Sequence, residues 1–434
     1  MAIVKRNSLW IREQMSKFDT FIGIFVDVDG FYSYMKWIPP FTACRALTDN
    51  AKVATPSGTV GDFFHPEQIQ TGWTENTDYE VLGKRLRLTS GALTVGRHYR
   101  IEELKADDDF TNVGAPQNAS GQCFIATGDT PTHWEHSSVL WENEMGGYWV
   151  DMYLCSSSNA TMIAAGDVCN GSDTGRKCYI SQPLKVPRVA QTIAHFRQYL
   201  KSRFDKGGFL HLGQGAAYEG WAGKGGLMTD AHWNELWLWT RINRWLLRGN
   251  TNGYNASNHI PQWHLDPNDI GLKDPTLDAA WGGSLAGGGS KLWEIPVSDF
   301  CGNRWEFADG LRLNANGIYT ALKTVNPFTD PTDGYGHASF VDTGLTVDGV
   351  TSGQSVASLR TENLLKKHGI PASTVPSGQG GFDGQGFWYV ATDERISLRG
   401  GNCDSGARCP GALALINAPS DYAWYIGARA VLVP

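Results

Sequence analysis

The chain has 434 residues, of which 41% are hydrophobic, so it is long enough to bury the cores of two or three compact units. A formal net charge of −7, with no cluster of lysine and arginine, argues against a nucleic-acid partner. Glycine is frequent, with 51 residues, but it follows no Gly-X-Y period, which excludes collagen.

No run approaches the roughly 18 apolar residues that a membrane-spanning helix needs, so we expect no membrane insertion. The most apolar run, residues 21–28, is short and contains Asp27, and the acidic residues upstream of it do not fit a cleaved signal peptide. The eight cysteines form no Cys-x-x-Cys pair and have no histidines at metal-ligand spacing. We expect most of them to be buried thiols, and we expect neither a metal site nor another cofactor.

The first part of the chain divides into two regions. Residues 1–93 contain a helix-like stretch at 9–18 and the strand-like run at 21–28. Residues 94–142 alternate short apolar runs with turns rich in glycine and aspartate, which predicts a small β-rich inserted module. Its three consecutive aspartates, 107–109, lack the glycine and glutamate of an EF-hand loop, so an acid-rich turn is favoured over a calcium site.

Two helices are expected in the next part of the chain. A buried strand is predicted at 147–154. An amphipathic helix is predicted at 189–204, where apolar residues recur at helical spacing. Thr229 is placed to cap a second helix at 230–247, which carries apolar residues on two faces.

After residue 250 the sequence predicts turns and short strands. The pair Asn316-Gly317 lies between two apolar stretches and predicts a β-hairpin. Further short strands are expected at 386–392, 396–401 and 426–433. We therefore predict an α+β fold, with the two helices packed on a small antiparallel sheet and with long irregular loops.

Four segments occur in an order that resembles a known superfamily. They are LMTDAHWNELWLW (227–239), RGNTNGYN (248–255), NRWEFADGLRL (303–313) and LRGGN…YIGARAVLV (398–433). Together they resemble the C-type-lectin-like fold of the formylglycine-generating-enzyme superfamily. The resemblance implies a single C-type-lectin-like domain at 147–434 with ligand-binding loops near its C-terminal end.

The end of the chain is similar to the variable, ligand-binding region of phage tropism determinants and other proteins diversified by retroelements. Paired glycines let backbones pass closely, and an arginine can pin a turn through two hydrogen bonds to carbonyls or a carboxylate. The predicted structural frame consists of Arg399, Gly400, Gly401, Ile426, Gly427 and Arg429. The sequence departs from this family at Cys403, where an aromatic residue is usual, and its 410–417 stretch is shorter.

Short loops between the frame positions place polar and aromatic residues side by side. Rigid aromatic rings beside adaptable polar groups are typical of binding surfaces. The predicted ligand-binding residues are Asn402, Asp404, Ser405, Arg408, Asp421, Tyr422, Trp424 and Tyr425. The alternative interpretation is an ordinary exposed loop with Trp424 and Tyr425 packed into the core.

The inserted module supplies a second resemblance. Its motifs DDFTNVGA and FIATGDTPTHW resemble a module of phage tail-associated proteins. The two resemblances imply a virion surface protein, located on a phage tail or head appendage and made in the host cytoplasm. They imply a host cell-surface receptor, protein or glycan, as partner, together with other virion proteins. They also imply a homotrimer, with residues 1–93 serving virion anchoring or oligomerisation. We predict no catalysis, because the sequence departs from the oxidase pattern around Cys403 and Cys409.

Two other functions remain as alternatives. Cys403 and Cys409 follow the Arg-Gly-Gly segment as the reactive cysteines of copper-dependent formylglycine-generating oxidases do, and two thiolates favour Cu(I). Their spacing is one residue too long, and the intervening DSGAR matches the binding branch instead. The second alternative is a purely structural decoration protein, which shares every sequence feature with the attachment protein. Motifs for calcium-dependent sugar binding are absent from the sequence.

Overall fold

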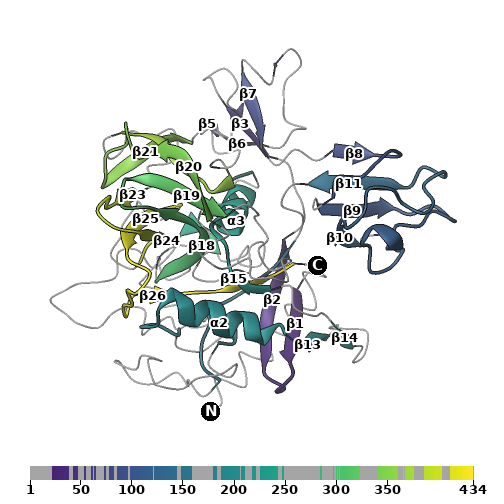
Figure 1. Cartoon of the computed structure of the whole chain (residues 1–434), viewed down its shortest axis with the longest axis horizontal. Coiled ribbons are helices and arrows are strands. Elements are labelled where there is room, and N and C mark those ends of the chain that lie inside the picture. Colours follow the sequence, from purple (N-terminus) through teal and green to yellow (C-terminus); the bar gives the residue numbers. More distant parts are fainter. Residues whose placement is uncertain are drawn as a thin grey trace. The chain divides into compact units, whose positions relative to one another are not determined.

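The structure is a computed structural model of the whole chain (Figure 1). It describes residues 22–38, 43–46, 53–54, 60–61, 63–64, 73–74, 78–82, 86–95, 98–120, 122–143, 148–158, 179–182, 187–205, 207–210, 218–220, 225–242, 247–248, 284–285, 297, 300, 302, 304–322, 340–359, 365, 367–375, 386–402 and 411–433. These residues separate into two compact units, one built mainly from 1–37, 149–240 and 245–432, and the other from 38–148.

The first unit contains a seven-stranded sheet that joins distant parts of the chain. In spatial order its strands are β14 (Tyr218–Gly220), β13 (Gly207–Leu210), β1 (Ile22–Asp27), β2 (Tyr32–Ile38), β12 (Tyr148–Asp151), β27 (Ala430–Leu432) and β15 (Gly225–Leu227). The N-terminal hairpin β1–β2 and the C-terminal strand β27 therefore belong to one sheet. In this sheet β12 lies between the purple β2 and the yellow C-terminal strand β27 (Figure 1).

Helix α2 (Ile193–Arg203) packs beside β15 of this sheet (Figure 1). It begins later than the predicted 189–204 because Thr192 has extended backbone angles and caps the helix by accepting a hydrogen bond from the His195 backbone N–H. The ring of Phe204, at the helix end, lies so close to Gly225 that a Cβ there would approach it to 2.4 Å. This glycine is needed for the close approach of helix and strand.

The same unit contains a nine-stranded sheet. Eight of its strands follow the order β20 (Phe340–Thr346), β19 (Ile318–Leu322), β18 (Trp305–Leu313), β24 (Arg395–Arg399), β25 (Leu413–Asn417), β23 (Gly386–Tyr389), β21 (Gln354–Leu359) and β22 (Pro371–Val375). The ninth strand, β26 (Ile426–Gly427), pairs with β18 in parallel orientation, and β23 pairs with β25 in parallel as well. The sheet is therefore mixed.

The predicted hairpin at Asn316-Gly317 is confirmed. Strands β18 and β19 pair antiparallel on either side of it, and Gly317 has the positive φ of +70° that this turn requires. The Asn314 side chain supports the turn, because its Oδ1 accepts hydrogen bonds from the backbone N–H groups of Asn316 and Ile318.

The second helix, α3 (Asp230–Ile242), starts where the sequence predicts. The Thr229 hydroxyl accepts a hydrogen bond from the His232 backbone N–H at 3.2 Å, which confirms the cap. Residues 243–246 are outside the described part, and Leu247 lies in β16 (Leu247–Arg248), which pairs with β17 (Ser284–Leu285). The predicted end of the helix at 247 is therefore wrong.

The second unit holds a four-stranded sheet in the order β10 (Cys123–Ile125), β9 (His98–Glu103), β11 (Val139–Asn143) and β8 (Leu86–Leu88), with a 3₁₀ turn η3 (Thr111–Val113). A separate core packs on it, including Tyr99, Ile101, Phe110 and Phe124. Strands β3 (Ala43–Ala46), β6 (Phe63–Phe64) and β7 (Tyr79–Leu82) form a small sheet, and β4 (Val53–Ala54) pairs with β5 (Val60–Gly61). The domain boundaries 1–93, 94–142 and 147–434 stay predictions.

The predicted fold class is wrong. In the described residues strands predominate, and they form several sheets of up to nine strands instead of one small antiparallel sheet covered by two helices. The sequence underestimated the strands because β20, β21 and β22 are rich in small and polar residues, so the alternating apolar pattern of a half-buried strand is missing. Main-chain pairing forms them instead: β20 pairs with β19, and β21 pairs with β22 and β23.

Two further sequence expectations concern membranes and cysteines. Across the part of the chain that the structure describes, no helix has the length and apolar character to cross a membrane. Cys44 and Cys155 are buried thiols, as predicted.

Candidate functional site

The candidate site is the C-terminal loop at 418–425, which connects β25 to β26. Its first turn is closed by Asp421, whose carboxylate accepts hydrogen bonds from the Ala418 backbone N–H at 2.8 Å and the Asn417 side chain at 3.4 Å. At its far end the Trp305 backbone N–H donates to the Tyr425 carbonyl at 2.9 Å. Both ends of the loop are therefore fixed to the nine-stranded sheet.

Aromatic side chains of this loop reach the surface. Tyr422 is 66% exposed and Trp424 is 38% exposed, while Asp421 and Tyr425 are half-buried. The Trp424 and Tyr425 rings meet edge to face, with centroids 5.5 Å apart. The alternative in which Trp424 is packed into the core is not what the structure shows.

Arg304 contacts both the ring and the backbone carbonyl of Trp424. Its guanidinium lies 5.4 Å from the Trp424 ring centroid and donates a hydrogen bond to the Trp424 carbonyl at 2.8 Å. A cation placed over an aromatic face is attracted by the ring electrons, so this contact orients the ring. Tyr422 therefore extends into solvent, whereas Trp424 is a supported ring with part of its surface open.

Arg399 anchors the start of the other predicted loop. It makes two hydrogen bonds of 2.8 Å to the Asp230 carboxylate at the start of α3, and it also donates to the backbone carbonyls of His368 and Gly411. Burial alone would raise the pKa of Asp230, but the charge and hydrogen bonds of Arg399, together with His368, outweigh burial and lower the pKa below its ordinary value. Asp230 is therefore a buried carboxylate that stays ionised beside its arginine.

The glycines after Arg399 have a conformational reason. Gly400 and Gly401 have φ angles of +82° and +72°, which side chains rarely adopt. At Gly400 a Cβ would also lie 2.9 Å from the Phe300 carbonyl oxygen. The Gly400 backbone N–H donates to the Ala412 carbonyl at 3.3 Å, so the two ends of the 401–411 segment are held together.

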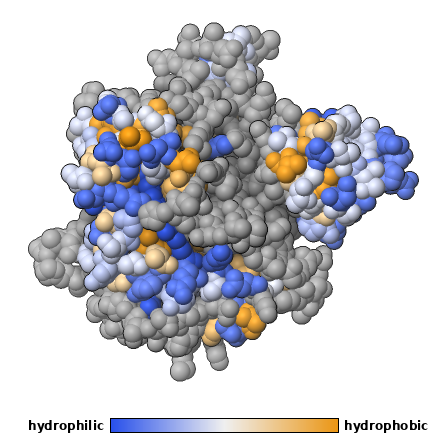
Figure 2. All heavy atoms as spheres, in the orientation of Figure 1, coloured by the Kyte–Doolittle hydropathy of each residue, from blue (hydrophilic) through white to orange (hydrophobic). Residues whose placement is uncertain are grey.

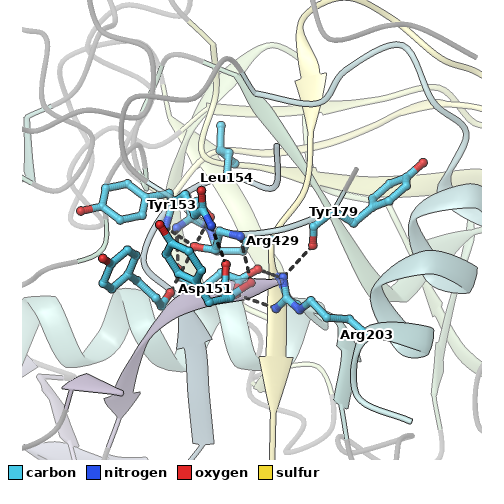
Figure 3. A network of polar contacts seen from close by, with 12 residues as sticks. Asp151, Tyr153, Leu154, Tyr179, Arg203 and Arg429 are labelled. Carbon is cyan, nitrogen blue, oxygen red and sulfur yellow. Dashed lines mark hydrogen bonds and ion pairs between the residues drawn. The ribbon is translucent and has the colours of Figure 1, made fainter. Parts of the chain in front are cut away.

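Arg429 joins the two sheets of the first unit (Figure 3). It makes two hydrogen bonds of 2.6 Å to Glu306 in β18 and a third of 3.1 Å to the Asp151 carbonyl in β12. Burial raises the pKa values of Glu306 and Asp151 more than their arginine partners lower them. Of the other frame positions, Ile426 is buried. A Cβ added at Gly427 would meet its nearest neighbour at 3.5 Å, an ordinary van der Waals distance.

The structure locates only part of the predicted binding set. Asp421, Tyr422, Trp424 and Tyr425 lie together on one loop, and Asn402 is half-buried after the Arg-Gly-Gly turn. The remaining predicted residues, Asp404, Ser405 and Arg408, lie outside the described residues, as do Cys403 and Cys409. The role of the binding set in ligand contact stays a prediction.

The sequence analysis did not assign roles to Asp230, Glu306 and Arg304. Asp230 and Glu306 stand inside the quoted Thr-Asp-x-x-Trp and Trp-Glu-Phe motifs, so those motifs were the available signal. Arg304 had no such signal, because its partner Trp424 is more than a hundred residues away. Over the described ranges, no group of three histidine, cysteine or acidic side chains lies close enough to hold a metal ion.

Comparisons with known proteins give few matches. No protein-family model matches the chain, and no curated protein matches it. Two solved structures with weak similarity are the "Major Tropism Determinant U1 Variant" and the "Major Tropism Determinant P3c Variant". Each is 12% identical, with a TM-score of 0.24, and the match covers 95% of this chain and 71% of the other. The structural neighbours are thus tropism determinants, but a TM-score of 0.24 carries no argument about the fold or function of this chain.

Proposed function

We propose that this chain is a surface protein of a bacteriophage virion and that the loop at 418–425 attaches it to a receptor on the host cell. The proposal rests on one observation: the loop carries exposed aromatic side chains, and hydrogen bonds hold both of its ends. Interfaces concentrate their binding energy in such rigid aromatic anchors. The phage-like motifs at 94–142 and 398–433 support the virion context.

The receptor would be a protein or a glycan, and the loop chemistry suits either. Tyr422 and Trp424 offer aromatic faces, while Asp421 and Asn402 add polar groups. Hydrophilic and hydrophobic side chains are interspersed on the face over the nine-stranded sheet (Figure 2), as in a wet interface rather than an obligate one.

Adsorption competition tests this function directly. Purified protein should block phage adsorption to the host, and Tyr422→Ala should weaken blocking roughly 30-fold, corresponding to about 2 kcal/mol for an anchor residue. Its melting temperature should stay unchanged, because the ring is 66% exposed. Tyr32→Ala, at a tyrosine 36% exposed on β2, is the matched control and should block as the wild type does. Normal blocking by Tyr422→Ala would place the attachment site elsewhere.

Oligomerisation is a separate part of the proposal. We expect a homotrimer anchored to other virion proteins through residues 1–93, since 17 tryptophans and 18 phenylalanines supply more apolar surface than a monomer readily covers. Light scattering of the purified chain measures this, and a monomer at micromolar concentration contradicts it.

The proposal includes no catalysis. Replacing Cys403 and Cys409 together with serine should leave adsorption blocking intact. Stoichiometric Cu(I) binding with oxygen-dependent oxidation of a peptide cysteine would instead support the oxidase alternative. A structural decoration protein is distinguished by a third outcome, in which antibodies to the chain label intact particles while the purified protein blocks no adsorption.

A further inference from the structure

Five charged side chains form a buried charge cluster inside the first unit. They are Asp27, Asp151, Arg203, Glu306 and Arg429, and each is at most 3% exposed. Asp27 ends β1, Asp151 ends β12, Arg203 ends α2 and Glu306 lies in β18, whereas Arg429 precedes β27. The cluster therefore connects α2 and both large sheets of the unit.

Four of these residues form a continuous chain of hydrogen bonds, and Figure 3 shows three of them, Asp151, Arg203 and Arg429. Arg203 donates to Asp151 Oδ1 at 2.6 Å, and the other Asp151 oxygen accepts from the Ala430 backbone N–H at 2.9 Å. Arg429 binds the Asp151 carbonyl and, through two hydrogen bonds, the Glu306 carboxylate. Each guanidinium thus neutralises one carboxylate.

Asp27 is the third carboxylate, and it has no guanidinium of its own. Its Oδ1 accepts hydrogen bonds of 2.9 Å from the backbone N–H groups of Asp29 and Phe31. Its Oδ2 is buried and has no hydrogen-bond partner within the described part of the chain, and the same holds for Arg203 Nε. Burial raises the pKa of Asp27, and the charge of Arg203 only partly opposes that rise, so the two groups lie within electrostatic range.

The charges of the cluster do not balance. Three ionised carboxylates against two guanidinium groups leave one excess negative charge in an environment that solvates charge poorly. Asp29 adds to this imbalance, because its negative charge raises the pKa of Asp27 further. Burial raises the pKa of all three carboxyl groups above their ordinary values.

We propose that the buried charge cluster binds one proton, shared among Asp27, Asp151 and Glu306, and that loss of this proton as the pH rises weakens the junction between α2 and the two sheets. The sign follows from linkage. A carboxyl group that holds its proton more tightly in the folded than in the unfolded chain contributes stability at low pH. That contribution is lost as the pH rises through the folded-state pKa. The effect does not depend on which ligand the loop binds.

The junction also supports the candidate loop. Glu306 follows Trp305, whose backbone N–H holds the Tyr425 carbonyl, and β18 pairs with β26 directly after the loop. A weakened junction at high pH should therefore loosen the loop before the rest of the unit unfolds.

Asp27→Asn tests the proposal, because it removes the excess charge and keeps Oδ1 as an acceptor for the turn. As the pH rises above the ordinary carboxyl range near 4, the unfolding constant of the wild type in urea should rise with pH more steeply than that of Asp27→Asn. The difference should reach up to tenfold per pH unit, the signature of one proton. Asp348→Asn, at an exposed aspartate of the same unit, is the matched control and should follow the wild type. Parallel curves for the wild type and Asp27→Asn would overturn the proposal.

A second measurement needs no variant and applies if Asp27→Asn does not fold. In the wild-type chain with ¹³C-labelled carboxyl carbons in aspartate and glutamate, one carbon assigned to Asp27, Asp151 or Glu306 should titrate above the ordinary carboxyl range near 4. The proposal is wrong if all three titrate within or below that range.

Discussion

Asp108 should contribute to the stability of the second unit, whereas its neighbour Asp107 should not. Asp108 is buried and accepts hydrogen bonds from three backbone N–H groups, those of Glu135 and His136 on Oδ1 and that of Ser138 on Oδ2, at 2.8–3.0 Å. It therefore ties the turn after β9 to the segment that leads into β11.

Asp108→Asn isolates the contribution of one carboxylate oxygen. The amide oxygen can still accept from Glu135 and His136, but the amide nitrogen faces the Ser138 N–H, and two donors then oppose each other. A hydrogen bond to a charged group contributes about 1.5–3 kcal/mol, and an unsatisfied buried donor costs about 1–3 kcal/mol. Since part of this loss relaxes through small shifts of the turn, we expect a destabilisation of about 2 kcal/mol.

The pH dependence of this carboxylate runs opposite to that of the charge cluster. Burial alone would raise the pKa of Asp108, but the hydrogen bonds from Ser138, His136 and Glu135 outweigh it and lower the pKa from 3.8 to about 2. A lowered carboxyl pKa contributes stability that is complete above about pH 4 and is lost as the pH falls toward 2. Asp108→Asn should therefore lose this acid dependence.

Hydrogen exchange of the full chain, followed in peptides from 98–143, is the assay. At pH 7 Asp108→Asn should speed exchange in this region roughly 30-fold, the equivalent of about 2 kcal/mol, and leave 305–322 unchanged. Asp107→Asn is the control, because Asp107 is exposed and its φ of +72° is tolerated well by asparagine. Equal exchange in the two variants would refute the role assigned to Asp108.

Three further outcomes follow from the first unit. Gly400→Ala should lower the free energy of unfolding in urea by about 2–3 kcal/mol, because both the positive φ and the nearby backbone oxygen oppose a Cβ. Gly344→Ala is the control. Gly344 has a φ of +74° but no atom near a Cβ, so the loss should be only about 1 kcal/mol. Burial holds the pKa of Glu235 well above its ordinary value, so the free energy of unfolding should fall as the pH rises and Glu235 ionises. Glu235→Gln should therefore raise the free energy of unfolding at pH 8 and make it depend less on pH. An unchanged pH profile would contradict this. Arg429→Met should cost about 3–5 kcal/mol by leaving Glu306 buried and unpaired, and adding Glu306→Leu should recover most of the loss in thermal unfolding.

Local signals in the sequence were sufficient for the features that depend on adjacent residues. The cap of α3 follows from Thr229 three positions before His232, and the turn of β18–β19 follows from Asn316-Gly317. Both depend on short-range hydrogen bonds and on the backbone angles that particular residues allow. Such features can therefore be recognised from a short stretch of sequence.

Sheet membership has no comparable local signal. The parallel pairing of β18 with β26 joins segments about 120 residues apart, and β1 enters a sheet with strands from three other regions. Such pairings depend on main-chain hydrogen bonds and on packing of both sheet faces. Hydrophobic periodicity therefore does not predict polar strands such as β20. The predicted α+β class failed for this reason, and not through a misread helix.

The motif resemblance identified the frame arginines Arg399 and Arg429 but not the carboxylates that they bind. Arg399 and Arg429 each take a carboxylate from another element, Asp230 and Glu306, and both pairs are fully buried. A buried ion pair contributes little net stability relative to well-packed apolar residues, because desolvation offsets the attraction between the charges. A buried ion pair instead disfavours alternative strand positions, because a shifted strand would leave a buried charge unpaired. The frame therefore acts by fixing where β26 and the Arg-Gly-Gly turn lie, and that fixed geometry leaves the loop at 418–425 able to present Tyr422 without contributing to the core.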